Sequence, residues 1–120
     1  MGNVVFTSEA MLKERPQVVQ AYVNGLLRGW QAALANPDAS VDVMLKVTPS
    51  LEKRKELAIL KATVPFIKGG TDAPIGVMDS AQWAQTRDIL VKHAGLDAAV
   101  VVDSAFDNRF VEAAHKTAGK

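Results

Sequence analysis

The stretch from Pro16 to Pro37, PQVVQAYVNGLLRGWQAALANP, has the clearest helical period in the chain. Its apolar residues recur at steps of three and four, which predicts a helix with one broad apolar face. Pro16 suits the first turn and Pro37 cannot continue the same helix, so the two prolines set its boundaries. The predicted face comprises Val19, Tyr22, Val23, Leu26, Trp30, Ala33 and Leu34, and Gln17, Asn24, Arg28 and Gln31 fall largely away from it.

Two glycines, Gly25 and Gly29, lie one turn apart inside this predicted helix. Each costs about 1 kcal/mol relative to alanine in a helix interior. Their placement indicates either that another element approaches the helix backbone closely at this point, or that they are ordinary interior glycines. The sequence leaves both alternatives open.

Length and composition describe an ordinary globular chain of 120 residues, with 48% hydrophobic residues and a formal net charge of +1. This length predicts a single helical domain over residues 1–120. The chain has no surplus of basic residues that would indicate a nucleic-acid partner. Its apolar runs are all shorter than the roughly 20 residues that span a bilayer. The absence of Cys excludes disulfides and Cys-based zinc sites. The first ten residues, MGNVVFTSEA, lack the basic and apolar regions of an export signal.

The sequence before the central helix predicts a short strand and a short helix. Asn3 to Thr7 is β-branched and aromatic, which is typical of a strand. Thr7 or Ser8 then caps a helix from Ser8 to Arg15, with Glu9 where the helix dipole favours a negative charge.

After the central helix, a third helix opens at Pro37 or Asp38 and carries an apolar stripe, and a break follows at residues 48–50. The next helix begins near Ser50, and Pro65 should kink or end it. The stripe of the third helix is Val41, Met44 and Leu45, and the buried face of the fourth is Leu57, Ala58, Leu60, Val64 and Ile67.

The remaining part of the sequence predicts an ordered loop from Lys68 to Asp79 and two further helices. Asp79 or Ser80 caps the first of these, which runs through Ala94 and ends at Gly95. Residues 96–102 are either a second short strand or extended chain packed on the helices. Asp103 or Ser104 caps the last helix, which runs through about His115. The fold class is therefore mainly α, with five to six helices and one short N-terminal strand.

The sequence shows little that resembles a catalytic centre. His93 and His115 are far apart, without paired carboxylates, and are read as helix-surface residues, so we expect no metal, no cofactor and no catalytic residue. The serines mostly stand where a helix start is expected, which explains them as caps. Trp30 and Trp83 lie in regular apolar stripes and are predicted to be core anchors.

Three blocks of sequence resemble the solute-binding proteins of ABC importers for nitrate, sulfonate, taurine and thiamine-precursor pyrimidines, a group that also includes the yeast-type pyrimidine synthases. Together the blocks cover nearly the whole chain. They are Thr7-Ser8-Glu9 with Pro16, Val19, Tyr22, Arg28-Gly29-Trp30 and Asn36-Pro37; Gly76-Val77-Met78-Asp79 with Trp83; and Phe106-Asp107-Asn108-Arg109-Phe110, where Asp107 replaces the usual Thr.

The resemblance implies that the chain corresponds to the C-terminal helical part of a type II periplasmic-binding-protein lobe. The intact parent would bind a small anionic or pyrimidine-like nutrient, deliver it to an ABC permease and lie in the periplasm. Thr7 and Ser8 would then face the ligand cleft, or serve as a plain N-cap. Without an export signal, the chain expressed alone would stay in the cytoplasm.

Two other classes of function stay open at this point. A stand-alone helical protein-interaction module would also lack a catalytic site. An enzyme of pyrimidine synthesis fits less well, because the Cys cluster of that activity has no counterpart here. We also predict self-association, either through the N-terminal strand, whose edge would lack a partner, or through exposed apolar helix faces.

Overall fold

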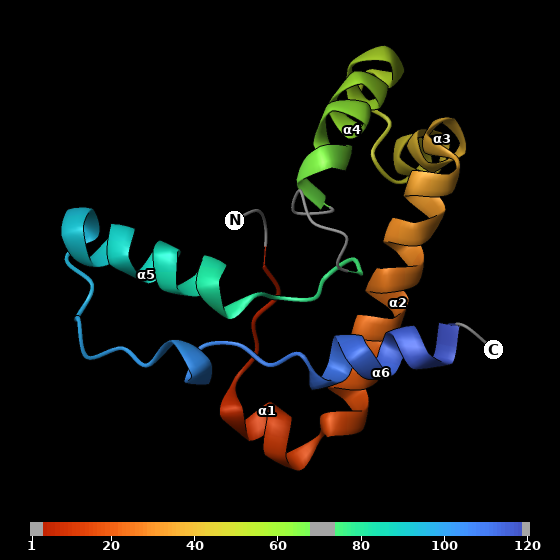
Figure 1. Ribbon diagram of the computed structural model, residues 1–120. Helices are drawn as coiled ribbons and strands as arrows, with labels where there is room; N and C mark the ends of the chain where they lie inside the picture. Colours follow the sequence, from red (N-terminus) through yellow and green to blue (C-terminus); the bar gives the residue numbers. More distant parts are fainter. Residues whose placement is uncertain (1–3, 68–73, 119–120) are drawn as a thin grey trace.

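The computed structural model describes residues 4–67 and 74–118 and is mainly helical, as predicted (Figure 1). Within these residues no β-strand occurs. The elements are α1 (Glu9–Glu14), α2 (Pro16–Ala35), α3 (Pro37–Val47), α4 (Lys53–Ile67), α5 (Ser80–Ala94), the short 3-10 helix η1 (Val102–Ser104) and α6 (Arg109–Ala118).

The strand predicted at Asn3 to Thr7 is wrong for the residues that the structure describes. Residues 4–8 have no regular secondary structure, and the Phe6 side chain is 92% exposed. Asn3 lies outside the described residues. A strand needs a neighbour to pair its N–H and C=O groups, and the described chain supplies no other strand. The β-branched composition alone therefore does not produce a strand here.

Helix α2 has the predicted boundaries, but its buried side is rotated from the predicted one. Leu27 is its only buried residue, whereas Tyr22 and Leu26 are exposed. The polar Asn24, predicted to point away, is half-buried. The rotation follows from the partner: α6 packs across α2 on the side of Gln20, whose Nε2 donates to the Phe110 carbonyl oxygen, and Asn24 and Leu27 lie one and two turns further along that side.

The hydrophobic core has two parts, one where α6 crosses α2 and one toward the other end of α2, where α3 packs against α2 and α4 (Figure 1). The buried hydrophobic residues of the described chain are Leu27, Val41, Phe110, Val111 and Ala114. Val41 belongs to the predicted stripe of α3 and is fully buried. Helix α4 pairs with α3 beyond this core and begins at Lys53, three residues later than predicted; it ends at Ile67, soon after Pro65. We call α1 to α4 together with α6 the body.

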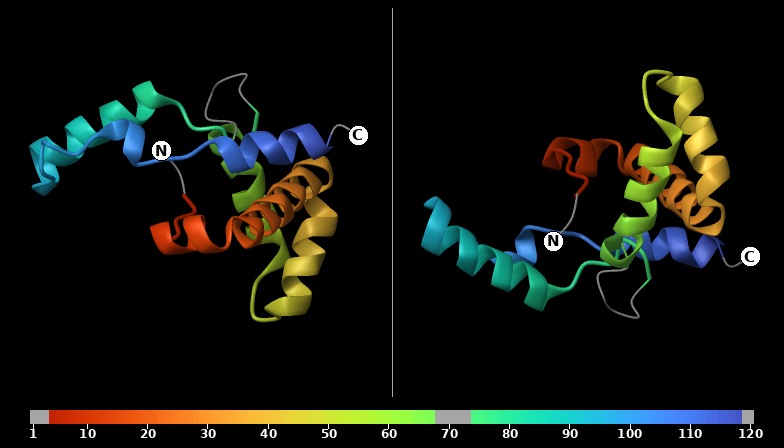
Figure 2. Two further views of the ribbon diagram at one scale, coloured as in Figure 1. Left: turned by 90° about the horizontal axis from the view of Figure 1, so that it is seen from below. Right: turned by 90° about the horizontal axis from the view of Figure 1, so that it is seen from above.

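Helix α5 and η1 form a projection that we call the arm, comprising residues 80–106. Figures 1 and 2 show it extending to one side of the body in each view. Its helix is bounded as predicted: the Asp79 carboxylate accepts from the Gln82 N–H, and Gly95 ends the helix in the left-handed conformation, with φ of 70°. The returning chain at residues 96–102 has no strand, so the strand alternative is wrong, and the chain is extended only in part, because it turns at residues 98–99 and enters η1 at Val102.

The last helix begins at Arg109, not at Asp103 or Ser104 as predicted. Those two residues form η1 instead. The physical reason is a competing N-terminal turn: the Arg109 N–H donates to Asp107 Oδ1 at 2.9 Å, and the Asn108 C=O accepts from the Glu112 N–H. By composition alone, Asp103 and Asp107 are equally suitable residues before a helix start.

The molecule is open rather than compact. Its radius of gyration is 16.6 Å, against about 13–14 Å for a compact domain of this length. Its accessible surface is 8871 Å², whereas a folded monomer of this mass exposes about 6,300 Å². Much apolar surface that a compact domain would bury is therefore in solvent.

Candidate functional site

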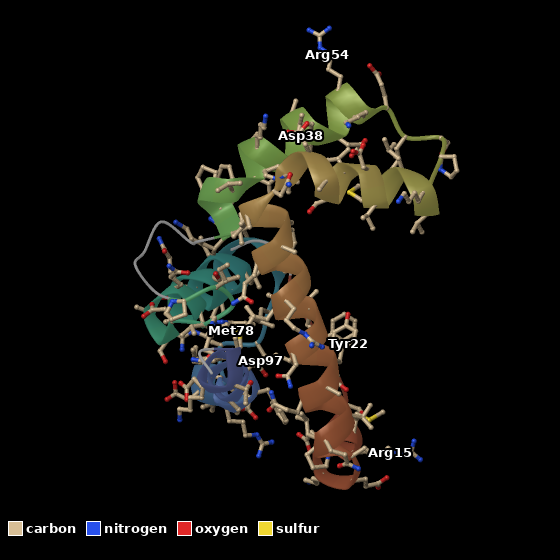
Figure 3. The ribbon with its side chains drawn as sticks, turned by 90° about the vertical axis from the view of Figure 1, so that its right-hand side faces the viewer. Arg15, Tyr22, Asp38, Arg54, Met78 and Asp97 are labelled. Atoms are coloured by element: carbon tan, nitrogen blue, oxygen red, sulfur yellow. The ribbon has the colours of Figure 1, made fainter. Side chains whose placement is uncertain are left out.

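The loop that leads into the arm meets α6 at a contact that we call the junction, formed by residues 75–78, Asn108, Val111 and His115 and supported from α2 by Gln20. At its centre the Met78 N–H donates to Asn108 Oδ1 at 2.9 Å, and Asn108 Nδ2 donates to the Met78 C=O at 2.8 Å. One carboxamide thus satisfies both backbone groups of Met78, as a neighbouring strand would. Figure 3 shows Met78 beside α6.

Gly76 allows the loop before α5 to approach α6 closely. Its φ is 83°, and a Cβ placed there would lie 3.1 Å from Val111 Cγ2. One turn further along α6, His115 Nε2 lies 2.9 Å from the Ile75 carbonyl oxygen. The half-buried His115 is therefore part of the junction, whereas His93 is exposed on the arm.

Helix α2 completes the junction with two polar side chains one turn apart. Gln20 Nε2 donates to the Phe110 carbonyl oxygen and to Asn24 Oδ1, both at 2.8 Å. The Phe110 carbonyl lies in the first turn of α6. Sequence reasoning missed Gln20, although two amides at i and i+4 on a helix are a recognised pairing signal.

A second contact, inside the arm, joins the motif block that includes Trp83 to the motif block that begins at Phe106. The rings of Trp83 and Phe106 are stacked, with centroids 5.5 Å apart and an interplanar angle of 17°. Beside them is an apolar slot of about 80 Å³ between α5 and the returning chain, which is well below the roughly 300–1,000 Å³ of small-molecule sites. The second and third motif blocks are therefore separated in sequence and adjacent in space, and their contact holds the returning chain against α5.

Thr7 and Ser8, the predicted ligand-binding residues, lie at the exposed start of α1. Ser8 Oγ accepts from the Met11 N–H at 3.2 Å, so this hydroxyl acts as the N-cap of a six-residue helix. The structure does not bring either residue to the junction. Their role in ligand binding stays a prediction.

Other features of the described surface do not define a binding site. An open groove on α5 is lined only by residues of that helix, among them Asp88, Lys92 and His93. In the part of the chain that the structure describes, no three His, Asp or Glu residues are grouped to hold a metal ion. None of the helices described combines the length and the hydropathy of a membrane span.

One ion pair links α3 to α4. Lys53 Nζ lies 2.6 Å from Asp42 Oδ1. The hydrogen bond to the Asp42 carboxylate raises the pKa of Lys53 above its ordinary value of 10.5, with the nearby charge of Asp38 acting in the same direction. Both side chains are exposed, so this pair orients two helices at the surface and does not define a binding site.

Comparisons with known proteins agree with the motif blocks. Residues 1–40 match the protein family described as NMT1/THI5 like. The chain is 31% identical over 115 residues to the riboflavin-binding protein RibY of Chloroflexus aurantiacus, which covers 92% of this chain and 33% of that protein. It is 27% identical over 112 residues to the formylaminopyrimidine-binding protein of Halalkalibacterium halodurans, which covers 88% of this chain and 33% of that protein. No solved structure matches the chain.

These similarities confirm the resemblance to NMT1/THI5-like solute-binding proteins that the motif blocks predicted. The chain spans about a third of the length of the curated relatives that it matches. Those relatives are named as binding proteins and not as enzymes.

Proposed function

We propose that this chain is a helical part of a solute-binding protein that delivers a small nutrient to an ABC permease. The observation that carries the proposal is the 31% identity to a riboflavin-binding protein along 92% of the chain. In this proposal residues 1–120 are one helical domain, corresponding to the C-terminal part of a two-lobed parent. The parent would act outside the cytoplasmic membrane and would bind its ligand without transforming it.

The ligand class follows from what the two named relatives share. Riboflavin and formylaminopyrimidine both contain a pyrimidine ring, whereas neither is a sulfonate or nitrate. We therefore favour a pyrimidine-containing heterocycle over the small anions that the wider family also takes. Thr7 and Ser8 would face the cleft from the start of α1, where free N–H groups add to the hydroxyls.

Neither hollow described above suits a heterocycle, because the arm slot measures about 80 Å³ and the groove on α5, of about 530 Å³, is open to solvent and lined by a single helix. A binding pocket usually buries at least about 70% of a ligand's surface. The cleft of the proposed protein must therefore be completed by polypeptide other than the described residues.

The proposal is tested by calorimetry on two samples. The first is the 120-residue chain alone, which should bind none of riboflavin, formylaminopyrimidine, taurine, an alkylsulfonate or nitrate with micromolar affinity. The second is a chimera in which the chain replaces the matching third of the Chloroflexus riboflavin-binding protein. We expect the chimera to bind a pyrimidine heterocycle and to ignore the sulfonates.

Site variants of the chimera test Thr7 and Ser8. Replacing both with alanine should weaken binding by about tenfold, the factor that one lost hydrogen bond of about 1.4 kcal/mol produces. Ser104→Ala, an exposed change on the arm, is the matched control. Micromolar binding by the isolated chain, or a folded chimera that binds no heterocycle, would contradict the proposal.

A further inference from the structure

Within the described residues, the arm is attached to the body mainly through two short connections. Among the helices, α5 packs on η1, and neither of them packs extensively on a helix of the body. The outgoing connection, residues 74–79, and the returning connection, residues 107–108, contain no helix or strand. Figures 1 and 2 show the arm on one side of the body in each view. The position of the arm therefore depends on these two connections.

On the body side, both connections are anchored to α6. The Asn108 C=O accepts from the Glu112 N–H, so Asn108 is the residue from which α6 starts. Its carboxamide holds both backbone groups of Met78, and His115 Nε2 lies 2.9 Å from the Ile75 carbonyl oxygen. The outgoing connection is therefore fixed to the body as far as Met78, and the returning chain is fixed from Asn108 onward.

On the arm side, the start of α5 is joined to the returning chain. The rings of Trp83 and Phe106 are stacked, with centroids 5.5 Å apart. Ser80 Oγ donates a long hydrogen bond of 3.4 Å to Asp103 Oδ1 in η1. These two contacts hold the first turns of α5 against η1 and Phe106, so the arm is cross-linked internally at its base.

One residue on each connection separates the part fixed to the body from the part fixed to the arm. Asp79 separates Met78 from the start of α5, and Asp107 separates Phe106 from the start of α6. We call these two residues the hinge. The Asp79 carboxylate accepts from an N–H of α5 and the Asp107 carboxylate from an N–H of α6, so neither bond crosses the hinge. Hinges in proteins are typically a few loop or element-terminal residues of this kind.

We propose that the arm rotates as one rigid unit relative to the body, by changes of the backbone angles at Asp79 and Asp107. Such a rotation keeps the hydrogen bonds and the ring contact described above, and it uncovers no buried side chain of α5 or η1, because these helices contain none. Asp79 has φ of −108° and ψ of 127°, in the broad extended region where both angles can vary without strain. Asn108 limits the rotation, because it keeps Met78 on the body. This inference does not depend on the proposed function.

Pulsed EPR distance measurements on the 120-residue chain test the proposal. The chain contains no Cys, so pairs of spin labels can be attached to Cys introduced at exposed positions. Lys92→Cys with Lys46→Cys reports the distance between arm and body. Lys92→Cys with Ser104→Cys reports a distance inside the arm, and Arg28→Cys with Lys46→Cys one inside the body; all four positions are exposed. We expect the arm–body distribution to be at least about twice as wide as either of the other two.

Asn108→Ala tests what limits the rotation. This variant releases Met78 from the body and so lengthens the mobile part of the outgoing connection. The arm–body distribution should therefore widen further, while the distribution inside the body stays as in wild type. Asn24→Ala is the matched control, because it removes a half-buried carboxamide from α2 and leaves both connections intact. It should leave the arm–body distribution unchanged.

Two results in the wild type overturn the proposal. An arm–body distribution as narrow as the one inside the body means that the arm is held in a single position. A distribution inside the arm as wide as the arm–body distribution means that the arm does not move as a unit. These comparisons need no variant at Asn108, so they decide the matter even if Asn108→Ala fails to fold. Equal arm–body widths in Asn108→Ala and Asn24→Ala would overturn the role of Asn108.

Discussion

The body contains all the buried hydrophobic residues that the structure describes, whereas α5 and η1 of the arm contain none. In the body, Leu27, Val41 and Phe110 are shielded because helices cross over them. In the arm, one stacked aromatic pair covers part of α5, and the polar contacts of Asn108 with Met78 hold its base. The body is thus stabilised by burial, and the arm is held by a few specific contacts.

This difference teaches how stability is distributed along the chain. Burial of apolar area is additive and tolerant of small changes in shape, whereas two hydrogen bonds from one carboxamide depend on a single residue. We expect the arm to open locally while the body stays folded. Three variants test this distinction, in order of decreasing effect.

The largest effect is expected for Phe110→Ala in the body. Phe110 is 8% exposed, and truncating a buried phenylalanine typically costs about 3–5 kcal/mol. With so few buried residues, this loss is comparable to the whole stability of a small domain. Chemical denaturation followed by circular dichroism should show a much lower midpoint or no cooperative transition.

Phe6→Ala is the matched control for that variant, because it removes the same ring from a side chain that is 92% exposed. Its free energy of unfolding should change by less than about 0.5 kcal/mol. Equal losses in the two variants would show that the α2–α6 crossing is not the main source of stability.

The sequence predicted the helices of the body well and their burial less well. Prolines at Pro16 and Pro37 fixed the limits of α2 because their effect on the backbone is local. The buried side of α2 depends on where α6 crosses it, 90 residues away in the chain, and no periodicity within α2 contains that information. Tyr22 and Leu26 are therefore exposed despite lying in the apolar stripe.

The junction could be foreseen in part. The sequence identifies the motif blocks around Met78 and Asn108 separately, but the pairing of one side chain with a distant peptide group has no local signature. The predicted start of the last helix was wrong for a local reason, because by composition Asp103 is as suitable before a helix as Asp107, whose Oδ1 accepts from the Arg109 N–H. Thr7 and Ser8 stay a prediction.

An intermediate effect is expected for Asn108→Ala at the base of the arm. The variant leaves the N–H and C=O groups of Met78 without their partner, which costs about 1–3 kcal/mol for a buried group, and Met78 is half-buried. Hydrogen exchange should become faster for the amides of α5 and change little for those of α2. Asn108→Asp keeps the acceptor for the Met78 N–H and loses the donor to the Met78 C=O. The α5 amides of this variant should therefore exchange at a rate between those of wild type and Asn108→Ala. If α2 and α5 exchange faster by the same factor, the arm is not a separate unit.

The smallest effect is expected at the ion pair between α3 and α4, where Lys53→Met removes one exposed charge. Exposed pairs contribute little to stability. The pKa of Lys53 is raised above 10.5 by its hydrogen bond to Asp42, so the folded state holds the proton more tightly than the unfolded state. The contribution of the ion pair to stability is therefore fully present below pH 10.5 and is lost as the pH rises through the raised pKa of the folded protein.

Wild type and Lys53→Met should differ slightly in thermal midpoint at neutral pH and converge above pH 10.5. Lys61→Met, at an exposed position of the same helix for which the described residues show no ion pair, should not differ from wild type in this way. A difference that grows in alkali would mean that Lys53 is held by apolar contacts of its side chain and not by its charge.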